Sequence, residues 1–202
     1  MNMRTFFVCC LCSVAMYASA AERSADFFEG VRLHDEARGA SDAGKIERAK
    51  ALLEPLIESD PLALGYYGSA ISLEAAVAAE GKNGLKALGL LKKSGKLIDE
   101  AVRRDPENVD LRFLRMINSY GVSSDPPVKR WKEMKTDIDW LKARRSEFSA
   151  EWQGSLYLYE GHYLARSRDI DGAVSCYSEC VRASPGSAEA REAEMLLSRY
   201  EE

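Results

Sequence analysis

The sequence predicts an all-α protein, a right-handed α-solenoid of about four helical hairpins with a C-terminal capping helix. Two observations lead to this fold class. The first is the composition of the 202-residue chain, which is 46% hydrophobic and 30% charged with 6 prolines and 14 glycines, as is typical of a helical globular protein. The second is an internal repeat, in which residues 49–61, 94–106 and 173–185 align without gaps.

The repeat has a register that a helix explains. Each copy begins with a small residue, has a large residue four positions later and closes with a proline. The small residues are Ala49, Ser94 and Ala173, the large ones Leu53, Ile98 and Tyr177, and the prolines Pro61, Pro106 and Pro185. Residues four apart share one face of a helix, so each copy is interpreted as the second helix of a hairpin. The prolines recur at unequal intervals, so we expect hairpins of different lengths and one further hairpin between the last two prolines.

Residues 1–20 have the layout of a secretory signal peptide. Arg4 precedes an apolar run over residues 6–16, and Ala18-Ser19-Ala20 forms a small-residue cleavage site. The run is too short to cross a bilayer as a helix. We therefore expect export to the periplasm or another extracytoplasmic location, with residues 21–202 as a mature domain without a membrane span. A retained anchor is disfavoured by the cleavage site, and lipidation of a cysteine within residues 9–12 by the very short apolar run that it would leave.

The first half of the chain predicts two hairpins. The first pairs a helix over residues 21–38 with one over residues 46–57, whose last turn Pro55 should kink because proline has no backbone N–H. The second is longer, running over residues 62–80 and 85–104 with a turn at residues 81–84.

The second half predicts two more hairpins and a cap. A helix over residues 109–120 precedes a loop over residues 121–127 and a basic helix over residues 128–145. We expect the basic side chains to pair with local acids, the alternative being an acidic partner or an anionic membrane surface. A helix from residue 151 and another after Asp169 form the last hairpin, which a helix over residues 187–200 caps.

The last hairpin resembles the tetratricopeptide repeat (TPR) family. Its residues follow the family spacing W-x2-L-G-x2-Y, A-x3-F and P, with Glu160 in place of the usual leucine. The matching residues are Tyr157, Gly161, Leu164, Ala173, Tyr177 and Pro185. The resemblance implies stacked TPR-like hairpins whose first helices line a concave face.

In the family, that face binds a peptide or a partner protein. Carried over to this chain, the resemblance implies an exported, non-catalytic scaffold, suited to an extended peptide with an acidic group. The partner-binding residues that it implies are His34, Arg38, Asp110, Phe113, Ile117, Tyr120, Ser155, Leu158, His162 and Arg166.

An alternative is a periplasmic accessory protein that holds a small apolar or anionic ligand in an aromatic-lined pocket. The basic helix over residues 128–145 would form an entrance for an anionic ligand to such a pocket. Its aromatic residues would be Tyr66, Tyr67, Phe113, Tyr120, Trp152 and Tyr159. The distinction depends on whether the structure has an open groove or an enclosed apolar cavity.

Other functional classes find no support in the sequence. It has no glycine-rich phosphate loop, no His-Glu-x-x-His and no nucleophile elbow, so we expect neither catalysis nor a cofactor. Cys176 and Cys180 lack zinc-site spacing, and we interpret Cys180 as a small core residue and Cys176 as its neighbour rather than as metal ligands with His162. The net charge of -4 argues against nucleic-acid binding.

The signal-peptide interpretation makes a direct prediction. Cleavage after Ala20 should produce a mature chain that begins at Ala21. Mass spectrometry of the intact secreted protein measures this. A chain that retains Met1, or one that begins with a lipid-modified cysteine, would show that the protein stays attached to a membrane.

Overall fold

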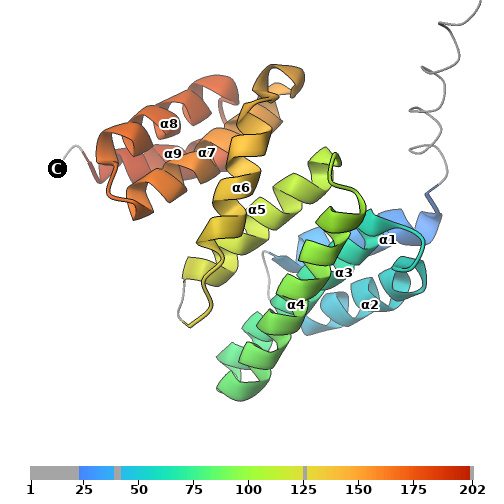
Figure 1. The fold of residues 1–202 in the computed structure, drawn as a ribbon. Helices are drawn as coiled ribbons and strands as arrows, with labels where there is room; N and C mark the ends of the chain where they lie inside the picture. The colour runs from blue at the N-terminus through green and yellow to red at the C-terminus, as the bar shows by residue number, and fades with distance from the viewer. Residues whose placement is uncertain (1–22, 39–41, 125–126, 201–202) are drawn as a thin grey trace, which may run out of the picture.

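The computed structural model describes residues 23–38, 42–124 and 127–200, and its regular secondary structure there is entirely helical (Figure 1). The all-α prediction is confirmed for these ranges, and the predicted signal peptide lies outside them. The helices are α1 (Ala25–Arg38), α2 (Ala43–Leu53), α3 (Pro61–Glu80), α4 (Gly84–Arg104), α5 (Val109–Ser124), α6 (Trp131–Lys142), α7 (Ala150–Arg166), α8 (Ile170–Ala183) and α9 (Ala188–Ser198). Short 3-10 turns follow two of them, η1 (Glu54–Leu56) after α2 and η2 (Arg145–Glu147) after α6.

Side-chain caps set where many of these helices begin. At eight helix starts an Asp, Asn or Ser side chain accepts a hydrogen bond from a backbone N–H two or three residues later. Such a bond satisfies a donor that has no partner within the helix. The capping residues are Ser24, Asp42, Asp60, Asn83, Asn108, Ser149, Asp169 and Ser187.

Three elements have boundaries that differ from the sequence prediction. Pro55 does not kink a continuous helix, because α2 ends at Leu53 and the chain continues as the 3-10 turn η1. The predicted loop over residues 121–127 is too long, since α5 continues to Ser124. Ser123 is buried there, and its hydroxyl accepts the backbone N–H of Arg130 at 2.6 Å, just before α6 begins. The basic helix is correspondingly shorter than predicted.

Consecutive helices pack in pairs, α1 with α2, α3 with α4, α5 with α6 and α7 with α8, while α9 packs on α7 and α8. The first helices of neighbouring pairs also contact each other, α1 with α3, α3 with α5 and α5 with α7. This pattern places α9 at the C-terminal end of the row, where it covers the last pair (Figure 1).

A glycine on the first helix makes a close contact with the second helix in three pairs. A Cβ atom built on Gly30, Gly68 or Gly161 would lie 2.8, 3.0 or 2.5 Å from the nearest side-chain atom of the second helix. The side chains that occupy this space are Leu53, Ile98 and Tyr177. These are the large residues of the internal repeat, so the repeat reflects one recurring contact.

The same contact explains the unequal spacing of the repeat. Residues 161 and 177 are 16 positions apart, residues 30 and 53 are 23 apart, and residues 68 and 98 are 30 apart. Each step of seven residues adds about one helical turn to each helix of a pair. The same faces therefore stay in contact while the hairpins lengthen. As a result α3 and α4 extend about two turns further past the glycine contact, toward their connecting turn, than α7 and α8 do.

Helix α3 is also the most apolar element. Within the described residues it is the one helix long and apolar enough to cross a membrane, with a mean hydropathy of 1.2. In the structure 61% of that window is buried, because α1, α2, α4 and α5 pack around it. A central core helix meets the same criteria.

The glycine contact can be tested with two Gly→Ala variants. Gly161→Ala should lower the free energy of unfolding by about 1 to 2 kcal/mol, because overpacking against Tyr177 outweighs the gain in helix propensity. Gly89→Ala in α4 is the control, since no atom lies within 4 Å of its added Cβ. That variant should be stabilised by about 0.5 to 1 kcal/mol. Urea denaturation followed by circular dichroism measures both, and equal effects would contradict the proposed contact.

Candidate ligand-binding pocket

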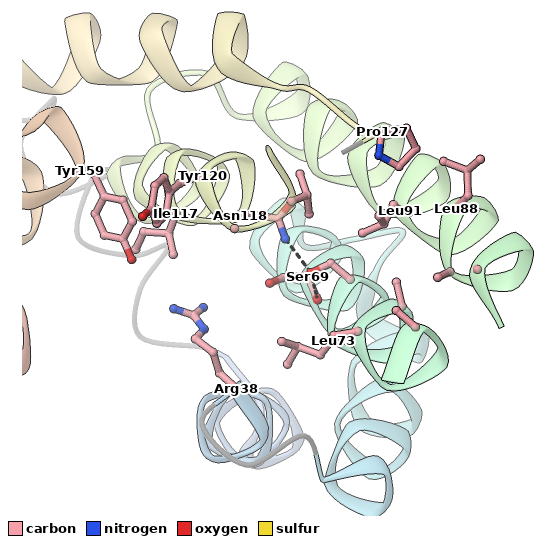
Figure 2. A pocket seen from close by; sticks show the side chains of 18 residues that line it. Arg38, Ser69, Leu73, Leu88, Leu91, Ile117, Asn118, Tyr120, Pro127 and Tyr159 are labelled. Carbon is pink, nitrogen blue, oxygen red and sulfur yellow. Dashed lines mark hydrogen bonds between the residues drawn. The ribbon is translucent and has the colours of Figure 1, made fainter. Parts of the chain in front are cut away.

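A pocket of about 520 Å³ opens where α1, α3, α5 and α7 come together (Figure 2). One wall is the extended end of the α3–α4 hairpin, and the opposite wall is the C-terminal half of α5. Most of the lining side chains are apolar. The lining residues are Arg38, Ser69, Ser72, Leu73, Ala75, Ala76, Ala79, Gly84, Ala87, Leu88, Leu91, Ile117, Asn118, Tyr120, Gly121, Val122, Pro127 and Tyr159.

The extended α3–α4 hairpin creates this space. Its additional turns have small residues, among them Ala76 and Ala79 on α3 and Ala87 on α4, where bulky side chains would fill the gap. Leu88 and Leu91 border the space from α4. The pocket is therefore apolar because the hairpin extends beyond the helices that would bury it.

The few polar side chains in the middle of the pocket are bonded to one another. His34 Nε2 lies 2.8 Å from the Ser69 hydroxyl, and the Ser72 hydroxyl donates to the Ser69 carbonyl oxygen at 2.7 Å. Asn118 Nδ2 in turn donates to the Ser72 hydroxyl at 2.7 Å (Figure 2). Burial lowers the pKa of His34, so the ring is neutral near pH 7. This network leaves few hydrogen-bonding groups for a ligand.

One end of the pocket has polar groups that are available to a ligand. Arg38, in the last turn of α1, extends into the space in front of Tyr120 and Tyr159 (Figure 2). No acidic side chain among the described residues forms an ion pair with it. Burial raises the pKa of Tyr159 to about 12, against the opposing effect of the Arg38 charge, so the phenol remains an O–H donor. This end therefore presents a guanidinium and a phenol.

The structure brings together three of the ten residues implied by the family resemblance. Arg38, Ile117 and Tyr120 line the pocket. Asp110 and Arg166 are exposed but lie outside it. The remaining five are buried, which corrects the expectation that they face a partner. They are His34, Phe113, Ser155, Leu158 and His162.

The row predicted along α7 is the clearest of these corrections. Leu158 is 1% exposed and His162 is 8% exposed, because α8 and α9 cover that side of α7. His162 Nε2 lies 3.1 Å from the Glu192 carboxylate of α9, and Nδ1 lies 3.3 Å from the Tyr177 hydroxyl. The ring stacks on Tyr120 with centroids 4.2 Å apart. His162 therefore packs against the ring of Tyr120, which lines the pocket, and is not itself exposed to a groove.

The aromatic set of the alternative hypothesis is also only partly assembled. Tyr120 and Tyr159 line the pocket. Phe113 and Trp152 instead pack against each other, with centroids 4.2 Å apart. Tyr66 and Tyr67 belong to the core around α3. Sequence reasoning missed the alanines and leucines of the lining, although an Ala-rich run beside a Leu-rich run in the longest hairpin was a visible signal.

The basic helix is not an entrance to this pocket. None of its seven basic side chains lines the cavity, and four of them pair with acids of other elements. The pairs are Arg130 with Asp99, Arg144 with Glu107, and both Lys142 and Arg145 with Glu160. Glu160 is the residue that departs from the family leucine, and its buried carboxylate is thus held by two cations.

The described residues give no support to a metal site or a disulfide. In the described part of the chain no three His, Cys, Asp or Glu side chains are arranged to hold a metal ion. Cys176 and Cys180 are free thiols, and Cys180 is buried as interpreted from the sequence. No family model, curated protein or solved structure matches the chain.

The buried position of His162 leads to a stability prediction. His162→Ala should lower the free energy of unfolding by about 2 kcal/mol, because it removes a packed ring and leaves the Tyr177 hydroxyl unpaired. Arg166→Ala, one turn later and exposed, should change it by less than about 0.5 kcal/mol. Urea denaturation of the two variants measures this difference. Equal stability of both would show that His162 contributes no packing.

Proposed function

We propose that this protein is an exported, non-catalytic helical-repeat protein of the TPR type that holds an apolar ligand in the pocket between α3, α4 and α5. The observation that carries the proposal is a half-open cavity of about 520 Å³ with a mostly apolar lining. Small-molecule sites typically have volumes of roughly 300 to 1,000 Å³ and such linings.

Three features support the TPR-type arrangement. The glycine contact recurs in three helix pairs at the positions of the internal repeat. The first helices of the pairs contact one another in chain order. All four first helices contribute to the pocket, through Arg38, Ser69, Ile117 and Tyr159 among others. In the family, the face lined by first helices is the binding face.

The chemistry of the lining favours an apolar ligand over an extended peptide. Each residue of an extended peptide brings an N–H and a C=O that need partners when they are buried. The polar side chains of the pocket, Ser69, Ser72 and Asn118, are already bonded to each other or to His34. A ligand without backbone polar groups is thus buried at a lower cost.

A partner protein is the second candidate for the same face. It is favoured by the contribution of four separate helix pairs to one open cavity. A partner helix would satisfy its own backbone and insert apolar side chains between α3, α4 and α5. Export is proposed for either function on the pattern of residues 1–20.

Filling the pocket tests the proposal. Ala76 is exposed at the pocket wall, so Ala76→Trp should occupy the cavity while the protein stays folded. Ala51→Trp, at an exposed site on α2 outside the pocket, is the matched control. The neutral dye N-phenyl-1-naphthylamine should bind the wild type and Ala51→Trp with saturable fluorescence, and Ala76→Trp at least about tenfold more weakly. Equal binding by all three, or none by the wild type, would contradict a small-ligand site.

The partner-protein candidate is tested with the same variants in intact cells. Crosslinking followed by identification of the attached protein should give a product that Ala76→Trp loses and Ala51→Trp retains. Such a product, together with absent dye binding, would favour the second candidate. Folding of each variant is checked by its circular dichroism spectrum and melting temperature.

A further inference from the structure

The two ends of the pocket differ in chemistry. Arg38 and Tyr159 lie at one end, whereas Leu88, Leu91 and Pro127 lie at the other (Figure 2). Between these ends the walls are alanine and leucine side chains of the extended hairpin. The pocket thus has one charged end and one apolar end, as a ligand with a head and a tail requires.

The charged end suits a compact anion. A guanidinium presents five N–H donors in a planar fork that matches carboxylate and phosphate oxygens. Arg38 has no acidic partner among the described residues, so its charge is available to a ligand. Tyr159 adds a hydroxyl that remains protonated at neutral pH. A cationic head would instead be repelled by Arg38.

The remaining length suits an unbranched apolar tail. The additional turns of α3 and α4 extend the apolar wall by about 11 Å, the rise of two helical turns. The polar groups beside this path are Ser69, Ser72 and Asn118, which are already hydrogen-bonded. A hydrocarbon chain passes them without leaving any ligand group unpaired.

From these features, and resting on the small-ligand function proposed above, we infer that the ligand is a single-chain amphiphile with a compact anionic head. Arg38 and Tyr159 hold the head, and the tail lies along α3 and α4 toward Leu88 and Leu91. Carboxylate and phosphate heads share the required chemistry. Arg38 is exposed, so solvent screens its charge and the head contributes selectivity more than affinity.

Displacement of N-phenyl-1-naphthylamine from the mature protein tests the inference. The probes are dodecanoate, dodecyl phosphate, dodecan-1-ol and dodecyltrimethylammonium, each below its micelle concentration at pH 8 and one ionic strength. An anionic probe should bind about 5- to 10-fold more tightly than the alcohol, and the ammonium more weakly than either. Comparison of the first two probes distinguishes a carboxylate from a phosphate head.

Chain length provides a second measurement. Each methylene added from octanoate to dodecanoate should tighten binding by about fourfold while it still enters the pocket. Affinity that does not change with chain length would overturn the assignment of the tail to the apolar wall.

Substitution of Arg38 tests whether its guanidinium binds the anionic head group of the ligand. Arg38→Gln should weaken dodecanoate binding by about 5- to 10-fold and leave dodecan-1-ol unchanged, and Arg38→Lys should restore part of the loss. Arg32→Gln is the control, because Arg32 is on the same helix, outside the pocket, and paired with Glu29 and Glu36.

The outcomes separate this inference from the function on which it rests. If the wild type binds the dye, and dodecanoate and dodecan-1-ol displace it with equal affinity, the anionic head is overturned and the small-ligand function remains. If the wild type does not bind the dye, both the small-ligand function and the anionic head are contradicted. An equal loss of dodecanoate affinity in Arg32→Gln and Arg38→Gln would show a general charge effect and overturn the role of Arg38.

Discussion

The close contact between a glycine of one helix and a large side chain of the next is the constraint on which the structure depends. Without a Cβ atom at Gly161, the Tyr177 ring lies directly against the backbone of α7. The contact recurs at Gly30 and Gly68, so it fixes which faces of α1 and α3 meet their partners. Interiors pack to nearly crystalline density, and a side chain added at such a position must displace its neighbour. The remaining faces of the first helices are then left for contacts between pairs.

The pocket follows from varying hairpin length without changing this contact. An insertion of seven residues preserves the helical phase, since it adds about one turn to each of two helices. The pair α3 and α4 has two such insertions relative to α7 and α8, so its end extends past α5 and leaves alanine and leucine side chains without a packing partner. These apolar side chains, which would promote aggregation on an open surface, form the wall of the cavity.

Buried ion pairs link neighbouring helices, both within a pair and between pairs. The buried Asp137 of α6 binds Arg112 and Arg115 of α5. Glu160 of α7 binds Lys142 at the end of α6 and Arg145 of η2. Buried pairs of this kind contribute little net stability against apolar packing, but their geometry is specific, which favours one arrangement of neighbouring helices. Glu160 also neutralises two of the seven basic side chains of the basic helix. None of the basic side chains of that helix lines the pocket, whereas Arg38 of α1 does.

The sequence by itself determined the all-helical class, most helix positions and the repeat, because helical periodicity, proline stops and Asp, Asn or Ser caps act within four residues along the chain. It also indicated Arg38, Ile117 and Tyr120. Only the tertiary structure decided which helix faces remain open. His162 and Leu158 have the spacing of a groove-facing row, yet α9 covers them, and the pocket lining comes from five helices that are distant in sequence. Side-chain exposure depends on what packs across from a helix, and a pattern within that helix does not contain this information.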